Sequence, residues 1–183
     1  MYSEGYNICY KMTKYIAINK KRYDEIVEAY FKWKSLNDLI KSYGSRGVNF
    51  PELISESALC YALNFQLIRE SKGDAFDFSN NQIIEVKATS NYDRDTTSFS
   101  PKSPFDVLYF MRLDVQQDIL YIYNTNCNSE DLKKIDVNEN DTFGDHQEQS
   151  RRPRFSVIDK IIKKNNLNPI GHIDFKTKKV TIY

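Results

Sequence analysis

Residues 83–89, Ile-Ile-Glu-Val-Lys-Ala-Thr, contain an alternation of apolar and charged side chains that constrains the fold more than any other part of the chain. A period of two is typical of a β-strand, in which successive side chains point to opposite faces. Glu85 and Lys87 would then share one face, and the apolar residues beside them would line the other. The pattern predicts a strand that presents a carboxylate and an ammonium group side by side.

A second acidic residue precedes this strand at a distance that suits a β-hairpin. Asp74 lies eleven residues before Glu85, and the intervening Ser-Asn-Asn-Gln at 79–82 is rich in turn-forming residues. A two-residue turn at the two asparagines would place Asp74 opposite Lys87, on the face that carries both charged groups. A three-residue loop would bring Asp77 to that face instead, because a slip of one residue exchanges the two faces. The Asn-Asn pair suits a type I′ turn and favours Asp74.

Residues 52–70 have the apolar periodicity of an α-helix, and Pro51 suits its first position. Glu56 falls in the same stripe as the apolar residues Leu53, Cys60, Leu63 and Leu67. A carboxylate on the core-facing side of a helix is costly unless it is paired or bound to a metal ion. Glu52, by contrast, can sit in solvent. We therefore expect Glu56 to support a site, with an ion pair to a lysine as the simpler alternative.

Two carboxylates and a lysine on one hairpin suit the hydrolysis of a phosphodiester bond. This reaction is very slow in water, and an enzyme must bring a divalent cation against the phosphate to absorb charge and acidify a bound water. Mg²⁺ prefers oxygen ligands and keeps several waters, so Asp74 and Glu85 suffice to hold it. Lys87 could orient or deprotonate the attacking water, or stabilise the developing charge. The alternative is an ordinary exposed ion pair between Glu85 and Lys87.

A helix glutamate, then Gly-Asp, then Glu-x-Lys resembles the catalytic core of the PD-(D/E)xK nuclease superfamily, over about residues 50–125. The resemblance implies an α/β fold with a mixed central β-sheet flanked by helices and a metal site formed from adjacent strands. Gly73 stands where the proline of the family's name would be. Matched one by one, the implied catalytic residues are Glu56, Asp74, Glu85 and Lys87, and the three acidic ones are the implied metal ligands.

Two further segments resemble a narrower group, the type II restriction endonucleases that cut the interrupted palindrome GC, any base, GC. They are residues 91–101, Asn-Tyr-Asp-Arg-Asp-Thr-Thr-Ser-Phe-Ser-Pro, and residues 150–156, Ser-Arg-Arg-Pro-Arg-Phe-Ser. This likeness implies double-stranded DNA as the substrate and Mg²⁺ as the cofactor, with Mn²⁺ as a substitute. It also implies a homodimer that makes two cuts related by symmetry, and a cognate DNA methyltransferase as functional partner.

Basic residues are concentrated at the two ends of the chain, although the net charge is only +1. Residues 11–46 carry nine Lys or Arg residues against four acidic ones, and residues 151–183 carry nine against two. The connector at 128–150 carries two against seven. A site full of carboxylates would repel DNA unless basic segments flanked it. Charge runs of this kind are also common on plain solvated surfaces.

Residues 90–103, which leave the Glu-x-Lys strand directly, are the expected DNA-reading loop. They supply many polar side chains and little apolar content. Arg94 could pair with a guanine edge, while Ser98 and Lys102 suit phosphates. Farther along, a cluster of three arginines interrupted by a proline cannot relax into a regular helix, and we expect it to contact DNA. These arginines are Arg151, Arg152 and Arg154.

The length of 183 residues and the 40% hydrophobic content fit one nuclease domain spanning 1–183, with a basic DNA-contacting part at about 150–183. Three widely spaced cysteines indicate neither a disulfide framework nor a zinc site. Without a membrane-length apolar run or a signal peptide after Met1, the sequence predicts a cytoplasmic protein. The expected elements are helices at 20–42, 52–70 and 155–165 and strands at 74–78, 83–89, 106–112, 118–124, 170–175 and 179–183.

Three functions fit these features. The first is a sequence-specific endonuclease that makes double-strand cuts at a short palindrome. The second is a structure-specific or repair nuclease of the same fold, which would cut branched or damaged DNA. The third is a DNA-binding module without catalysis, in which the Glu-x-Lys pair is only a salt bridge and no metal response is expected.

Overall fold

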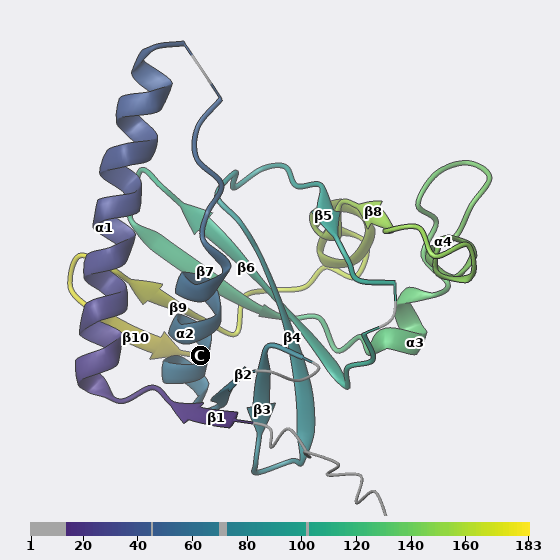
Figure 1. Ribbon diagram of the computed structural model, residues 1–183, viewed down its shortest axis with the longest axis horizontal. Helices are drawn as coiled ribbons and strands as arrows, with labels where there is room; N and C mark the ends of the chain where they lie inside the picture. Colours follow the sequence, from purple (N-terminus) through teal and green to yellow (C-terminus); the bar gives the residue numbers. More distant parts are fainter. Residues whose placement is uncertain (1–13, 45, 70–72, 102) are drawn as a thin grey trace, which may run out of the picture.

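A mixed β-sheet forms the centre of the computed structural model, which describes residues 14–44, 46–69, 73–101 and 103–183. Its eight strands follow the order β1-β2-β3-β4-β6-β7-β9-β10 (Figure 1). Within this sheet β4 and β6 run parallel, and all other neighbours run antiparallel. The predicted α/β fold, a mixed sheet flanked by helices, is confirmed. The strands are β1 (Lys14–Ala17), β2 (Gln66–Arg69), β3 (Ala75–Asp77), β4 (Gln82–Thr89), β6 (Val107–Asp114), β7 (Ile119–Asn124), β9 (Gly171–Asp174) and β10 (Lys179–Ile182).

Two hydrophobic cores lie on opposite faces of this sheet. Alternate residues of β6 divide between them: Tyr109 and Met111 belong to one core, whereas Leu108 and Phe110 belong to the other. Helices α1 (Lys20–Ser42) and α2 (Glu52–Leu63) close the first core. The second is closed by elements grouped away from α1 in Figure 1. They are β5 (Thr97–Ser98), α3 (Ser129–Leu132), α4 (Phe143–Glu148), β8 (Arg154–Phe155) and a π-helical turn, η1 (Ile158–Lys163).

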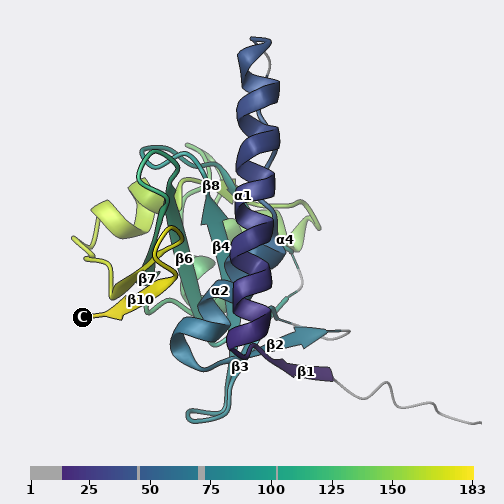
Figure 2. The ribbon, with the colours of Figure 1, turned by 90° about the vertical axis from the view of Figure 1, so that its left-hand side faces the viewer.

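Helix α1 has the predicted bounds, and its C-terminal end projects beyond the sheet (Figure 2). Asn19 caps its start by accepting a hydrogen bond from the Arg22 N–H at 3.0 Å. Hydrogen bonds made by the side chains of Asn37 and Trp33 join the projecting end to the chain that returns from it. The Asn37 side chain accepts from the Val48 N–H at 3.1 Å, and the Trp33 indole donates to a backbone carbonyl of the returning chain at 3.0 Å.

Helix α2 is shorter than predicted, because the chain turns at Asn64. Asn64 adopts the left-handed conformation with φ of 56°, which ends a helix at little cost for asparagine. Residues 66–69, predicted as the last helical turn, instead form β2 and pair with β1 and β3. Leu53 is 47% exposed and does not belong to the buried stripe, whereas Glu56 is 8% exposed, as the sequence predicts.

The β3–β4 hairpin forms in a different register from the predicted one. Asp77 pairs with Gln82, so the connection is a four-residue loop at 78–81 rather than a two-residue turn. The Asp77 carboxylate closes this loop by accepting from the Ser79 N–H and the Asn80 side chain, both at 2.8 Å. Because the register differs by two residues, the faces are unchanged. Asp74 comes beside Glu85 rather than opposite Lys87 and stays on the predicted face.

The predicted strands at 106–112, 118–124, 170–175 and 179–183 are confirmed as β6, β7, β9 and β10. The predicted helix at 155–165 appears as the shorter π-helical η1. The acidic connector holds α3 and α4, and each of these short helices begins with a capping box. No helix among the described residues is both long and apolar enough to cross a membrane.

Candidate active site

Asp74, Glu85 and Lys87 lie together where the β3–β4 hairpin meets the second core. The Asp74 backbone N–H donates to the Ile84 carbonyl at 2.9 Å, and its side-chain Oδ2 accepts from the Val86 N–H at 2.8 Å. The Lys87 Nζ lies 2.6 Å from the Glu85 Oε1. Main-chain and side-chain bonds to the same strand therefore fix the Asp74 carboxylate beside the Glu85–Lys87 pair.

Burial, together with repulsion by neighbouring carboxylates, makes the Asp74 and Glu85 side chains difficult to ionise. Burial is the main cause that raises the pKa of Asp74 and of Glu85, and the Lys87 ammonium only partly offsets it. Burial also opposes the charge on Lys87, but the attraction of Glu85 and Asp74 outweighs it and raises the pKa of Lys87. Lys87 is therefore protonated at neutral pH, which favours a charge-stabilising role over proton abstraction.

Glu56 points from α2 toward the same group of charges. Burial, and then repulsion by Asp74, raise its pKa to about 7, against the attraction of Arg69. The Arg69 Nη1 lies 3.7 Å from the Glu56 Oε2, and the Arg69 side chain is 40% exposed. The expected lysine partner is thus an arginine on β2, at a distance too long for a strong ion pair.

Glu52 belongs to this region too, contrary to the expectation that it only sits in solvent. It lines a cleft together with Lys87, and its negative charge contributes to the raised pKa of Asp74, Glu85 and Glu56. The sequence signal for this role is that Glu52 precedes Glu56 by about one helical turn, which places both on the same side of the helix.

Gly73, which stands where the PD-(D/E)xK motif that the sequence resembles has proline, has a backbone that proline cannot adopt. Its φ is 84°, whereas the proline ring fixes φ near −65°. A Cβ at this position would also collide with the Ile83 side chain. The departure from the superfamily's motif therefore follows from the way this chain enters β3.

The donor set suits a metal ion that needs few protein ligands. Among the described residues, no three or more His, Cys, Asp and Glu side chains form a ready-made metal cage. Asp74 and Glu85 nevertheless offer adjacent carboxylates whose ionisation a nearby cation would favour. Mg²⁺ commonly binds one or two carboxylates and keeps several waters, so these residues fit it.

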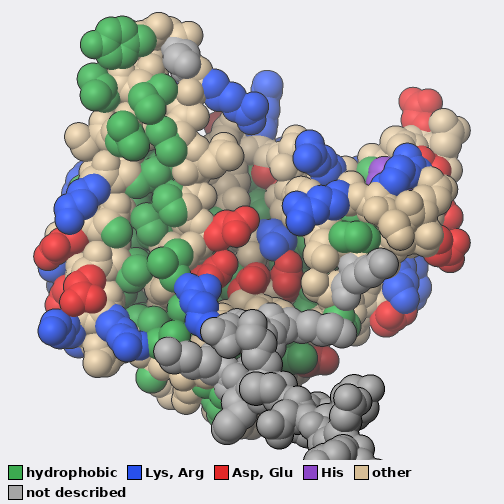
Figure 3. Space-filling view, in the orientation of Figure 1, with side chains coloured by type: hydrophobic (Ala, Val, Ile, Leu, Met, Phe, Trp, Pro, Cys, Tyr) green, Lys and Arg blue, Asp and Glu red, His purple; other side chains and the backbone are tan. Residues whose placement is uncertain are grey.

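A cleft of about 700 Å³ opens above these residues, between the projecting end of α1 and the β5–β8 pair. Acidic side chains gather low in the hollow between these elements, and lysine and arginine side chains surround its upper part (Figure 3). Lys87 lies in the wall of the cleft, together with the basic residues Lys41, Arg46, Arg94 and Arg154. A cationic rim around buried carboxylates is the arrangement that a polyanionic substrate requires.

The predicted DNA contacts divide between this cleft and the outer surface. Arg94, Ser98 and Arg154 line the cleft. Arg151 and Arg152 do not line it, and Arg151 lies 3.1 Å from the Asp141 carboxylate. Lys102 lies outside the described residues. Sequence reasoning missed Lys41 and Arg46, for which the net positive charge of residues 11–46 was the available signal.

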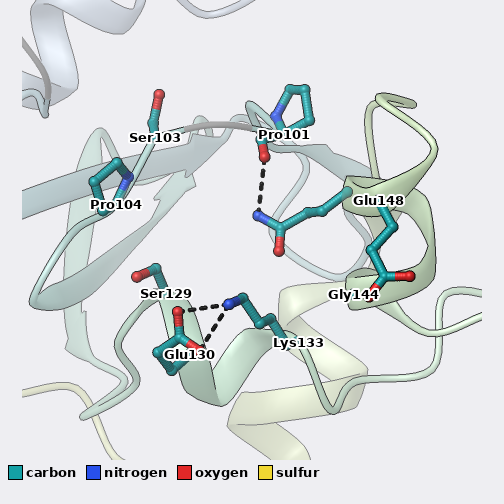
Figure 4. Close-up of a pocket in the computed structure, with 9 residues that line it drawn as sticks. Pro101, Ser103, Pro104, Ser129, Glu130, Lys133, Gly144 and Glu148 are labelled. Atoms are coloured by element: carbon teal, nitrogen blue, oxygen red, sulfur yellow. Dashed lines mark hydrogen bonds and ion pairs between the residues drawn. The ribbon is translucent and has the colours of Figure 1, made fainter.

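A second hollow of about 380 Å³ lies between helices α3 and α4 and the residues Pro101, Ser103 and Pro104 (Figure 4). Its lysine, Lys133, is 2.6 Å from Glu130, and the Gln147 amide donates to the Pro101 carbonyl at 3.2 Å. It shares no lining residue with the first cleft. The polar groups of this second hollow bind one another. The first cleft, which has Lys87 in its wall, is therefore the candidate active site.

Comparison with known proteins assigns the sequence to a family. The family model described as Bsp6I restriction endonuclease matches residues 18–164, which include the hairpin, α2 and the rim of the cleft. The chain belongs to the Bsp6I restriction endonuclease family. The Type II restriction enzyme Bsp6I of Bacillus sp. (strain RFL6) is 55% identical over 166 residues, which cover 91% of this chain and 95% of that enzyme. No solved structure matches significantly.

Membership in this family decides among the three functions. The chain is a type II restriction endonuclease, hence a hydrolase that cuts DNA internally. The non-catalytic DNA-binding module and the repair nuclease are not supported. The matched residues contain every candidate catalytic side chain, and one of these, Lys87, lines the cleft.

Proposed function

We propose that this endonuclease makes Mg²⁺-dependent double-strand cuts through a PD-(D/E)xK site formed by Asp74, Glu85 and Lys87, with Glu56 in support. The observation that carries the proposal is the fixed position of the Asp74 carboxylate, bonded to the Val86 N–H beside the Glu85–Lys87 pair. Two buried carboxylates beside a protonated lysine, which lies in the wall of a cationic cleft, suit a phosphodiester substrate.

In this proposal, Asp74 and Glu85 hold the metal ion and Glu56 adds negative charge behind them. When bound, Mg²⁺, or Mn²⁺ in its place, neutralises phosphate charge and acidifies a water molecule. Lys87 donates hydrogen bonds to the attacking oxygen or to a phosphate oxygen, because its raised pKa keeps it protonated. Since Nζ lies 5.8 Å from the centre of the Phe99 ring, the ammonium is confined between that ring and Glu85.

The proposed target is the interrupted palindrome GC, any base, GC, in double-stranded DNA. Arg94 supplies a guanidinium that can bind the guanine edge in two places, and Ser98 and Lys102 are proposed phosphate contacts. Arg151, Arg152 and Arg154 are proposed further contacts. A homodimer would supply the second active site that a symmetric double-strand cut needs, and a cognate methyltransferase would protect the host's own sites.

The decisive experiment incubates the purified protein with plasmid DNA and Mg²⁺ and maps the ends of the products by sequencing. Discrete fragments that end at GC, any base, GC are expected, and chelation of the metal should abolish them. Lys87→Ala should give no fragments, whereas the matched control Lys133→Ala, in the second hollow, should cut normally. Wild-type cutting by Lys87→Ala would overturn the proposed site, and ends at another sequence would overturn the target.

A further inference from the structure

The Asp95 side chain joins two segments of the cleft wall that lie far apart in the sequence. Its Oδ1 accepts from the Ser156 hydroxyl at 2.7 Å and from the Ile158 N–H at 3.1 Å. Its Oδ2 accepts from the Thr97 hydroxyl at 2.6 Å and from the Val157 N–H at 2.9 Å. One carboxylate therefore takes four donors, three of them from the segment at 156–158.

Two of these donors, the Val157 and Ile158 N–H groups, lie at the start of η1, where backbone N–H groups have no partner within the helical turn. A carboxylate is the favoured acceptor there, because the N-terminal end of a helical segment carries partial positive charge. The Asp95 carboxylate, which belongs to the loop that leaves β4, thus accepts hydrogen bonds from the backbone N–H groups at the start of η1. The β5–β8 pairing runs alongside it, with Ser98 in register with Arg154.

Two cleft arginines stand directly beside this connection. Arg94 precedes Asp95 in the chain, and Arg154 lies two residues before Ser156; both line the cleft. In the part of the chain that the structure describes, neither guanidinium has an ion-pair partner, whereas Arg151 is paired with Asp141. Exposed, unpaired guanidiniums on a braced backbone are available to bind an external acceptor.

The opposite end of the loop is held separately. Arg112 of β6 donates from Nε to the Tyr92 carbonyl at 3.0 Å, and its guanidinium carbon lies 4.1 Å from the centre of the Tyr92 ring. Arg112 thus fixes the loop to the central sheet. Asp95 and the β5–β8 pairing together link the same loop to the segment that carries Arg154, so both contribute to the spacing between the two arginines.

We propose that Asp95 is a positioning residue for base recognition, which holds Arg94 and Arg154 at a fixed spacing so that both contact the target duplex at once. The proposal rests on the proposed binding of DNA in this cleft. A guanidinium that binds a guanine edge in two places needs accurate placement, and an error of about 1 Å removes much of its selectivity. Asp95 should therefore affect discrimination between sequences, and leave the chemistry at Asp74 and Glu85 in place.

Asp95→Asn tests this arrangement because either orientation of the amide places an NH₂ group against a backbone N–H, of Val157 or of Ile158. Asp93→Asn is the matched control, since Asp93 is exposed and lies two residues away in the same loop. Ser156→Ala is a milder variant that removes one donor to Oδ1 and leaves the two backbone donors. All variants are compared below their melting temperatures.

The readout is the ratio of affinities for two duplexes, one with the site mapped from wild-type cleavage and one with a single G·C pair changed. Affinities are measured with Ca²⁺, and KM and kcat with Mg²⁺. For Asp95→Asn we expect the ratio to fall about tenfold or more and KM on the true site to rise, with kcat within about threefold of wild type. Ser156→Ala should change the ratio in the same direction, and Asp93→Asn should leave it unchanged.

An unchanged ratio in both Asp95→Asn and Ser156→Ala would overturn the proposal, as would equal losses on the two duplexes, because a merely structural role affects all sequences alike. A fall in kcat without a change in the ratio would do the same. Failure of the proposed catalytic site is a separate outcome, since it appears as normal cutting by Lys87→Ala while the affinity ratio is still measurable.

Discussion

The Val86 N–H donates to the Asp74 Oδ2 at 2.8 Å, although eleven residues separate them in the chain. Val86 lies between Glu85 and Lys87 on β4, so this bond places the aspartate against the Glu-x-Lys strand at its functional residues. Its main-chain counterpart, from the Asp74 N–H to the Ile84 carbonyl, holds the same residue from the other side. The carboxylate is thus positioned before any substrate or ion arrives, and the first prediction follows from that.

Asp74→Asn should reduce the cleavage rate by about a thousandfold or more, because it removes the charge while the amide oxygen can still accept from Val86. Asp77→Asn should cut at close to the wild-type rate, since Asp77 closes the hairpin loop on the opposite side of the strand. Initial rates on plasmid DNA distinguish the two. The reverse order of sensitivity would show that Asp77 is the metal ligand.

Lys87→Ala should abolish cleavage and keep DNA affinity within about threefold of wild type when Ca²⁺ replaces Mg²⁺. The reason is that Lys87 contributes one charge to a cleft with four other basic residues, yet lies beside the two carboxylates proposed to hold the metal ion. Filter binding or fluorescence anisotropy gives the affinity. A parallel collapse of binding and cleavage would assign Lys87 to substrate binding alone.

Glu56→Gln should slow cleavage but stabilise the metal-free protein at alkaline pH. The folded-state pKa of Glu56 is about 7, above its ordinary value of 4.5, because burial disfavours the charge. Its stabilising contribution is therefore complete below pH 4.5 and lost as the pH rises through 7. The wild-type protein should lose up to about 3 kcal/mol relative to the variant between pH 4.5 and 8.

Urea unfolding in the presence of a chelator, at pH 5 and at pH 8, measures that difference. Glu28→Gln is the control, because Glu28 is exposed on α1 and is not among the charges that shift the pKa of Glu56. It should leave the pH dependence of unfolding unchanged. If the stability of the Glu56→Gln protein followed the same pH profile as wild type, Glu56 would be an ordinary helix residue.

Asp118→Asn should destabilise the fold by about 2 kcal/mol at pH 7, because it weakens a buried carboxylate that binds three partners. Tyr30 donates to Asp118 at 2.6 Å, Lys176 lies at 3.1 Å, and Lys34 contacts the same group. Burial disfavours its charge, but the hydrogen bonds from Lys34, Tyr30 and Lys176 outweigh burial and lower its pKa.

The direction of the pH dependence of stability follows from the lowered pKa of Asp118. A lowered folded-state pKa stabilises the protein above the ordinary value of 3.8, and the effect is lost as the pH falls through the folded-state pKa. The difference between wild type and Asp118→Asn should therefore shrink below about pH 4. Asparagine tolerates the φ of 63° found here, so the backbone is preserved. Glu28→Gln on the exposed side of α1 should change nothing.

The three predicted arginine contacts should differ in their effect on DNA binding. Arg154→Ala should lower the salt dependence of affinity by about one unit if it contacts a phosphate, or relax one base position if it reads guanine. Arg151→Ala should have a smaller effect, since Asp141 already neutralises Arg151. Isotherms at several salt concentrations measure each slope. Equal effects of Arg151→Ala and Arg154→Ala would show that the ion pair between Arg151 and Asp141 opens on DNA binding.

How much of the site could be predicted depends on how local its determinants are. The shared face of Asp74, Glu85 and Lys87 followed from strand periodicity, and it survived a wrong register because the error was an even number of residues. The register itself depended on the Asp77 side chain, which extends the loop by two residues. Amino-acid composition could not show that the Asp77 side chain binds the loop in this way.

The remaining misses involve contacts between distant parts of the chain. Strand β2 was missed because residues 66–69 keep an apolar pattern that also suits a helix. The helix α2 in fact ends at Asn64. Lys41 and Arg46 reach the cleft only because α1 projects and the chain folds back along it. Asp95 stood in a segment singled out for DNA reading, yet its role depends on a partner segment about sixty residues later.

The positive φ of Gly73 also limits how far motifs can be transferred between relatives. Engineering toward the PD-(D/E)xK motif that the sequence resembles would install proline at this position. Here that change would break the entry into β3 and displace Asp74 from Val86. Gene libraries recombined from this family should therefore keep position 73 together with the residues that set its backbone, as one inherited unit.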